Sequence, residues 1–303
     1  MRGPHNILRL IRTGATLERT GAMPVILNAL DAPKTIKFAA RFIVWPFQFL
    51  GRKGDKSLLP APRALTAMGP AYIKFGQILS TRPDVVGPEL AEQLRVLQDR
   101  LPPFSTSVAK QSFKLETGLD ADDVFSHFSE PVAAASIAQV HRGQLRESGH
   151  SVAIKVLRPE IERAFQRDID TFYFAARLVE FVSPKSRRLK PIDVITHFDG
   201  VVQGELDLRL ESASASEFSA NIRNDKGFSV PSINWSLSSR RVMTLDWADG
   251  VPMGDTDALL AAGHNLSELG DRVLYMFLNH ALRDGFFHAD MHQGNLKVSS
   301  NGD

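Results

Sequence analysis

The sequence predicts an α+β fold in two lobes, and three observations lead to this prediction. Of the 303 residues, 43% are hydrophobic, which is enough to bury one large core or two smaller ones. Strand-like segments cluster between residues 136 and 245, whereas helical periodicity dominates before and after them. No long low-complexity tract interrupts the chain. This order predicts a small strand-rich lobe followed by a helical lobe, with a helical extension in front.

The predicted fold divides the chain into four segments. Residues 1–60 are expected to form basic amphipathic helices and 61–118 a helical extension. Residues 119–245 form the strand-rich lobe with two inserted helices, and 246–303 begin the helical lobe. A ligand between two such lobes is the usual arrangement for this architecture.

Composition and charge restrict the classes of function. The absence of cysteine excludes disulfides, thiolate zinc sites and cysteine nucleophiles. Residues 1–60 carry ten Lys or Arg against three acidic residues, although the whole chain has a net charge of only +2. This basic segment is rich in Phe and Trp, and no nucleic-acid-binding motif accompanies it. We therefore expect an anionic membrane lipid, and no nucleic acid, as its partner.

The apolar run from Phe38 to Leu50 is the candidate membrane contact. It is shorter than the roughly 20 residues that a spanning helix needs, and Arg41 and Pro46 interrupt it. Lys34 and Lys37 stand beside its aromatic residues, as in helices that lie in the lipid interface. An amphipathic helix packed on the protein body is the alternative. Charges occur throughout the first twenty residues, so no signal peptide is predicted.

The helical extension contains the motif Lys74-Phe75-Gly76-Gln77. Pro70 suits the first position of this helix, and Lys74 and Gln77, three residues apart, share one of its faces. Two further helices are predicted, one from Pro88 through Leu97 and a short one within residues 104–118.

A hairpin begins the strand-rich lobe. Its strands are expected at residues 136–141 and 151–157, with Gly143 and Gly149 in the connection. The second strand contains Val152-Ala153-Ile154-Lys155, the V-A-I-K of a kinase third strand. The other elements expected here are helices at 159–182 and 191–222 and strands at 228–230 and 241–245.

The last long helix, 266–283, precedes the stretch Phe286 to Asn295. Asp290 and Asn295 have the spacing of a kinase catalytic loop, in which the Asp accepts a hydroxyl proton and the Asn holds Mg²⁺. This spacing alone is common, but V-A-I-K upstream makes it informative. Together the two motifs predict ATP and Mg²⁺ as cofactors of a bilobal protein-kinase-like fold.

Four motifs now stand in order along the chain: K-F-G-Q at 74–77, A-A-A-S at 133–136, E-L-D at 205–207 and the loop from His288 to Asn295. This series resembles the UbiB family of atypical kinases (the ADCK group). The resemblance implies adenine-nucleotide binding and a role in ubiquinone biosynthesis at a membrane, with other proteins of that pathway as possible partners. It also implies ATP hydrolysis more than protein phosphorylation. The family loop reads H-A-D-P-H-P-G-N, and here Met291 and Gln293 replace its prolines.

Residue roles follow from the motifs and from the resemblance. Lys155 is expected to reach the nucleotide phosphates and to pair with Glu211, while Glu205 pairs with Lys74. On one continuous helix Asp207 and Glu211 share a face. Asp290 is the expected catalytic acid and Asn295 a Mg²⁺ ligand. The remaining predicted nucleotide-binding residues are Val132, Ala133, Ala134, Ala135, Ser136, Ile137, Ala138, Gln139 and Val140 in an alanine-rich loop, and Met243 and Leu245 in the hinge.

A D-F-G motif with the main Mg²⁺ ligand is expected soon after Asn295, but the chain ends at Asp303. We therefore expect a truncated helical lobe, a fragment with little activity of its own, and membrane helices beyond its end. The expected location is the cytoplasmic face of a bacterial inner membrane. The physiological substrate stays open between a protein, a small molecule and water.

Two other functions are compatible with parts of the sequence. One is a catalytically inactive scaffold that binds nucleotide, which the alanine-rich loop allows. The other is a zinc hydrolase built on His288, Asp290 and His292, although no further histidine has a recognisable ligand spacing and V-A-I-K would be unexplained.

Overall fold

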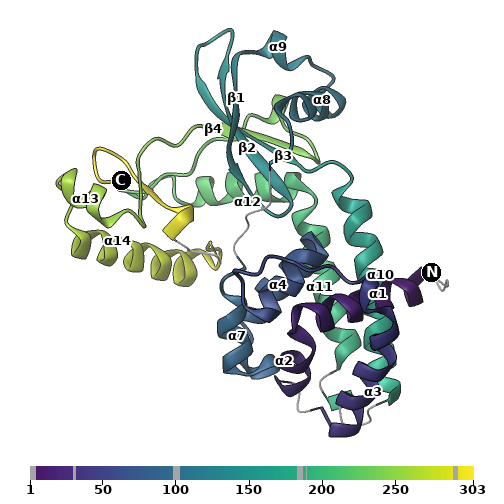
Figure 1. Ribbon diagram of the computed structural model, residues 1–303. Coiled ribbons are helices and arrows are strands. Elements are labelled where there is room, and N and C mark those ends of the chain that lie inside the picture. The colour runs from purple at the N-terminus through teal and green to yellow at the C-terminus, as the bar shows by residue number, and fades with distance from the viewer. Residues whose placement is uncertain (1–4, 30–31, 98–102, 183–186, 189, 289–292) are drawn as a thin grey trace. The chain divides into compact units, whose positions relative to one another are not determined.

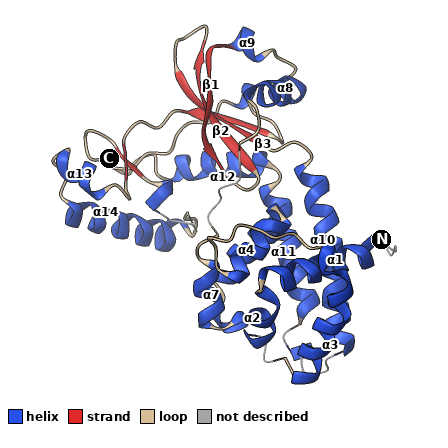
Figure 2. Ribbon diagram, in the orientation of Figure 1, coloured by secondary structure: helices blue, strands red, loops and turns tan. Residues whose placement is uncertain are grey.

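The computed structural model describes residues 5–29, 32–97, 103–182, 187–188, 190–288 and 293–303 (Figure 1). It confirms the α+β class, because many helices accompany a four-stranded sheet of order β1-β2-β3-β4 (Figure 2). The chain forms two compact units. The helical unit comprises Met1–Pro103, Ala134–Ala138 and Arg158–Leu206, and the sheet unit comprises Phe104–Ala133, Gln139–Leu157 and Asp207–Asp303.

The helical unit is built around aromatic rings. Phe172 contacts Tyr72 and Phe75, with ring centroids 4.7 and 5.2 Å apart, and Phe75 also meets Phe198. Its helices are α1 His5–Thr20, α2 Ala22–Ala29, α3 Lys34–Val44, η1 Trp45–Leu50, α4 Pro60–Met68, α5 Pro70–Ser80, α6 Pro83–Val86, α7 Pro88–Leu94, α10 Ile161–Val182 and α11 Pro191–Glu205.

The sheet unit buries one face of β3. Val152, Ile154 and Val156 alternate into a core shared with Phe113 and Phe125, which explains why this strand forms. The elements of the unit are α8 Thr106–Thr117, α9 Ala121–Val124, β1 Phe125–Ala134, β2 Ala138–Leu145, β3 Ser151–Leu157, α12 Leu208–Asn221, η3 Trp235–Leu237, β4 Val242–Asp246, β5 Val251–Pro252, α13 Thr256–Ala261, α14 Leu266–Asn279, η4 His280–Asp284, η5 Gln293–Asn295 and β6 Lys297–Val298.

The predicted continuous helix from 191 to 222 is wrong. It is interrupted after Glu205, and α12 begins anew at Leu208. Leu206 is buried, and the Asp207 side chain caps the new helix by accepting a hydrogen bond from the backbone N–H of Arg209 at 3.1 Å. An Asp in a helical pattern can occupy the interior of a helix or the N-cap of a new one, and Asp207 occupies the N-cap.

Strand predictions were also incomplete. Strand β1 was not expected from the sequence, and β2 continues to Leu145, beyond the expected end at residue 141. The predicted strand at 228–230 is absent, and only Ile233 bridges to Leu245. These segments mix polar and apolar residues, so local alternation did not identify their pairing.

The α3–η1 segment exposes an aromatic surface. Phe38 and Phe42 are 73% and 66% exposed and their rings stack 6.2 Å apart, while Trp45 and Phe49 are exposed as well. Lys34, on the same helix, is exposed beside them. Among the described residues, no helix combines the length and the apolar character that crossing a bilayer requires.

Asp168 on α10 makes the stability of the helical unit depend on pH. Burial raises the pKa of Asp168 to about 6, although the guanidinium groups of Arg9, Arg167 and Arg52 act in the opposite direction. Because this pKa lies above the usual value of 3.8, the folded state holds the proton more tightly. The resulting stability is fully present below about pH 4 and is lost as the pH rises through about 6.

We expect Asp168→Asn to remove this dependence. At pH 7 the variant should be more stable than the wild type by about 2 kcal/mol, since burying a neutral amide costs less than burying a carboxylate. At pH 4 the two proteins should unfold alike. Thermal unfolding of both proteins at pH 4, 5, 6 and 7 measures the difference. A variant that is less stable than the wild type at pH 7 would contradict the assignment.

Candidate functional site

Lys155 and Glu211 form the central ion pair of the sheet unit. The Lys155 Nζ lies 2.7 Å from both carboxylate oxygens of Glu211. Lys155 alternates with the buried residues of β3, so its side chain leaves the core, and Glu211 belongs to the first turn of α12. Their side chains are 25% and 47% exposed, respectively. The pair that the sequence analysis expected is therefore present, and a ligand can reach it.

The second expected pair lies in the helical unit. Lys74 Nζ on α5 is 2.6 Å from Glu205 Oε1 at the end of α11. Gln77 donates a hydrogen bond to the Leu97 carbonyl at 2.9 Å, which ties α5 to the segment after α7. A Cβ on Gly76 would overlap the terminal methyl carbons of Leu97 and Leu65, so a larger residue at this position of the motif would displace both leucine side chains.

Asp207 lies outside the helix that carries Glu211, as its N-cap, contrary to the expectation of one continuous helix. Besides capping α12, its carboxylate pairs with the Arg209 side chain at 2.9 and 2.5 Å. The Arg209 hydrogen bond lowers the pKa of Asp207. In the described structure Asp207 is therefore an ionised capping residue at the start of the helix that carries Glu211.

The alanine-rich segment forms the tip of the β1–β2 hairpin. Val132, Ala133 and Ala134 end β1, and Ala138, Gln139 and Val140 begin β2. The turn between them comprises Ala135, Ser136 and Ile137.

Hydrogen bonds hold this turn tightly. The Ala135 N–H donates to the Ala138 carbonyl at 2.8 Å, and the Arg158 N–H donates to the Ile137 carbonyl at 2.8 Å. The Arg158 guanidinium bonds the Ala135 carbonyl at 3.0 and 3.1 Å. The segment is a braced turn, unlike a glycine-rich loop with free N–H groups.

Gln139 is occupied inside the sheet unit. Its fully buried side chain accepts a hydrogen bond from the Phe104 N–H, donates to the Phe104 carbonyl and contacts His141 Nε2 at 2.8 Å. Burial lowers the pKa of His141, whose Nδ1 lies 2.8 Å from the Ser129 carbonyl. These contacts give Gln139 a role in holding β2 against the start of α8.

Met243 and Leu245 lie in β4, where Met243 is paired with Lys155 and Leu245 with Ala153. Just after the strand, Trp247 meets two cations. Arg142 lies 4.9 Å and the Lys297 ammonium 5.0 Å from its ring centroid. Of the two predicted hinge residues, Met243 is thus in register with the lysine, whereas the two cations beside Trp247 were not expected from the sequence.

Asp290, the predicted catalytic acid, lies outside the described residues, as does His292. Asn295 ends the exposed turn η5, and the strand pair β5–β6 follows it, with Val251 opposite Val298. Gly250 has φ +136° and its Cα faces the Val298 backbone, which leaves no space for a side chain. Within the described ranges, no three His, Cys, Asp or Glu side chains are grouped to hold a metal ion.

Comparison with known proteins gave one family match and many relatives. A family model described as the ABC1 atypical kinase-like domain matches residues 96–303. A protein of Marinobacter nauticus named "Probable protein kinase UbiB" is 38% identical over 90% of this chain and 49% of the relative. One of the same name from Azotobacter vinelandii is 40% identical over 97% of this chain and 55% of the relative. The chain thus spans about half the length of these relatives.

A solved structure is also similar. A Mycobacterium tuberculosis protein, whose solved structure is described as a complex with erythromycin, is 26% identical, with a TM-score of 0.55 over 77% of this chain and 58% of that one. The similarity supports the same fold for the two proteins.

Proposed function

The chain belongs to the ABC1 atypical kinase-like family, and on this premise we propose that it binds ATP with Mg²⁺ and supports ubiquinone biosynthesis by phosphoryl transfer or ATP hydrolysis. The observation that carries the proposal is the Lys155–Glu211 pair at 2.7 Å. A strand lysine paired with a helix glutamate is the arrangement that an active kinase uses to hold nucleotide phosphates. Two of the three Lys155 ammonium N–H groups bond Glu211, and the partial exposure of both side chains leaves the third accessible to a phosphate.

Each residue has a definite task in this proposal. Lys155 binds the α- and β-phosphates, and Glu211 orients its ammonium group. Asp290 accepts a proton from water or a hydroxyl, and the Asn295 amide oxygen is one Mg²⁺ ligand. The metal supplies neutralisation of the charge that develops on the phosphates. The amide and the ammonium group are chemically suited to these ligands.

The substitution Glu211→Gln tests whether the Lys155–Glu211 ion pair supports ATP binding. We expect an apparent Kd for ATP about tenfold higher than in the wild type, because the amide no longer attracts the Lys155 ammonium group. Glu92→Gln is the matched control, since Glu92 also pairs with a basic residue, Arg95, but on an exposed helix surface. ATP titrations of the 303-residue chain and of the complete gene product provide the measurement. An equal effect of the two substitutions would refute the assignment.

A nucleotide-binding scaffold without catalysis is the second candidate. The observation in its favour is the braced alanine turn, whose Ala135 N–H is already bonded to the Ala138 carbonyl and so does not point freely at a phosphate. Such a protein binds ATP but releases no product. Steady-state turnover by the complete gene product therefore separates the two candidates.

We further propose that the α3–η1 surface lies on an anionic membrane. Phe38, Phe42, Trp45 and Phe49 offer apolar side chains to the acyl boundary, and the neighbouring Lys34 offers charge to lipid phosphates. Clustered aromatic residues beside cations suit a lipid interface better than nucleic acid. We also propose a cytoplasmic membrane face as the location and other proteins of ubiquinone biosynthesis as partners, and both proposals rest on the family resemblance and not on this surface.

A further inference from the structure

A cluster of charged side chains fastens the end of α14 to the segment after α12. We call Asp225, His280 and Arg283 the Asp225 latch. Arg283 binds Asp225 through two hydrogen bonds, Nη1 to Oδ1 at 2.8 Å and Nη2 to Oδ2 at 2.9 Å. His280 Nε2 lies 3.1 Å from Asp225 Oδ2. One carboxylate is thus held by two side chains that come from a single helical turn.

The surroundings distinguish this cluster from an ordinary surface ion pair. His280 is only 2% exposed and packs edge-on against Phe218, with centroids 5.0 Å apart, and against Phe228 at 5.9 Å. The hydrogen bonds from Arg283 lower the pKa of Asp225 to about 2, so the carboxylate is ionised at neutral pH. Arg283 in addition bonds Asp284 at 2.7 Å.

The backbone at the latch is unusual. Residues His280–Asp284 form a π-helical turn, which ends at Gly285 in the left-handed region with φ +62°. Single π turns are rare and occur frequently at functional sites. This turn places His280 and Arg283 on the same carboxylate, and the chain then enters the segment toward Asn295.

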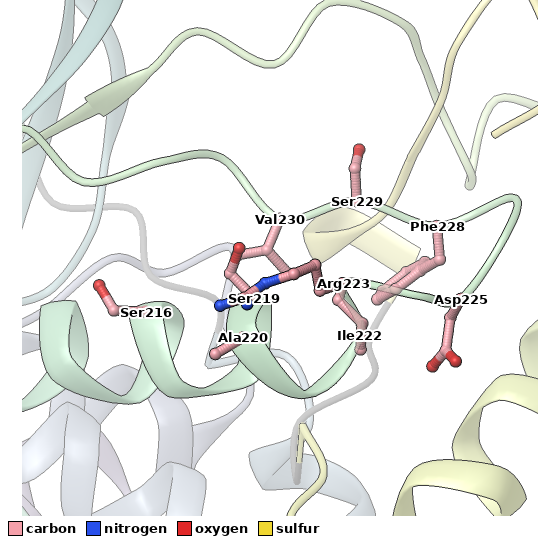
Figure 3. Close-up of a pocket in the computed structure, with 9 residues that line it drawn as sticks. All are labelled: Ser216, Ser219, Ala220, Ile222, Arg223, Asp225, Phe228, Ser229 and Val230. Carbon is pink, nitrogen blue, oxygen red and sulfur yellow. The ribbon is translucent and has the colours of Figure 1, made fainter.

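Figure 3 shows the segment that bears the aspartate. Arg223 extends back along α12 toward Ser219, and both Arg223 and Asp225 are among the residues that line an open cavity of about 360 Å³. Both carboxylate oxygens of Asp225 are nevertheless engaged by His280 and Arg283.

The latch connects two parts of the candidate site within the sheet unit. Helix α12 carries Glu211, the partner of Lys155, and its last residue, Asn221, is four residues before Asp225. The π turn lies directly before the segment that leads to Asn295. We propose that Asp225 is a positioning residue that sets the start of the Asn295 segment relative to the helix that carries Glu211. The catalytic consequence rests on the proposed function, but the positioning itself does not.

Hydrogen exchange of the 303-residue chain tests the positioning without any activity. In Asp225→Asn we expect the amides of Gly285–His288 and Gln293–Leu296 to exchange at least fivefold faster, while those of α8 stay unchanged. Asp84→Asn is the matched control, since it breaks another pair between an Arg and an Asp, with Arg82, on the surface of the helical unit. Unchanged exchange in both segments of Asp225→Asn would overturn the proposal.

Kinetics of the complete gene product separate positioning from simple loss of stability. We expect Asp225→Asn to lower kcat about tenfold with KM for ATP within twofold, and Asp225→Glu, which keeps the charge, to recover part of the loss. A kcat equal to that of the wild type, or a loss that follows a lowered Tm, would overturn the role. If the wild type itself turns over no ATP, the proposed function fails while the exchange result still decides the positioning.

Discussion

Asp290→Asn is expected to lower Mg²⁺-dependent ATP turnover by about 10³-fold in the complete gene product. An amide cannot accept the proton that the attacking water or hydroxyl loses, and general-base catalysis contributes about 10²–10⁴-fold. ATP affinity should change less than about threefold, because the phosphates are assigned to Lys155 and the metal. Release of inorganic phosphate at saturating ATP gives kcat, and equilibrium titration gives the affinity.

The control for this substitution is Asp257→Asn. Asp257 lies in the first turn of α13 and is exposed, so its replacement removes a charge from the same unit without touching the proposed site. If Asp290→Asn turns over ATP as the wild type does, Asp290 is not the catalytic acid. If the wild type binds ATP and releases no phosphate, the nucleotide-binding scaffold is the correct function.

Replacing Phe38, Phe42 and Phe49 together with Ser is expected to weaken binding to anionic vesicles by at least tenfold. Full burial of one such side chain contributes about 1.5–3 kcal/mol, so partial burial of three rings suffices for this effect. The electrostatic contribution of the basic side chains to vesicle binding should decline in 0.5 M salt, because salt shortens the Debye length. Flotation with vesicles of phosphatidylglycerol and phosphatidylcholine measures the bound fraction.

A triple variant of exposed apolar residues elsewhere provides the control. Leu115, Phe181 and Tyr275 are 78%, 81% and 72% exposed, and their replacement with Ser removes a similar apolar area. Equal binding by the two triple variants would show that the α3–η1 surface is not the contact. Self-association of the wild type that the first variant abolishes would show instead that a second copy covers this surface.

Much of the candidate site was predictable because its signals are local. The V-A-I-K strand formed as expected, since Val152, Ile154 and Val156 alternate with Lys155 and bury one face of β3. Pro70 begins α5 as predicted, and the two ion pairs join the residues expected to pair. Hydrophobic periodicity and the residue preferences at helix N-termini depend only on residues that are close in the chain, so they can be read from a single sequence.

Other features depended on contacts that local patterns do not contain. From the sequence, Asp207 could be a residue within a helix or the N-cap of a new one. The burial of Leu206 just before it accompanies the start of a new helix, and Asp207 is the N-cap of that helix. Gln139 lies in a motif associated with nucleotides, yet its amide bonds Phe104, which is 35 residues away in the chain. Neither outcome follows from the secondary-structure propensities of the residues, because tertiary contacts contribute more free energy than these propensities do.

The sequence by itself determined the family, the order of the motifs and the types of residue available for phosphate and Mg²⁺ chemistry. These follow from residue identity at fixed short spacing, such as Asp290 and Asn295. Only the tertiary structure decided that Asp207 caps α12, that the alanine-rich segment is a braced turn, and that Asp225 meets His280 and Arg283. Those last partners are 55 and 58 residues from Asp225. Their meeting depends on how the π turn after α14 packs against α12 and the segment that follows it, which no local pattern of the chain encodes.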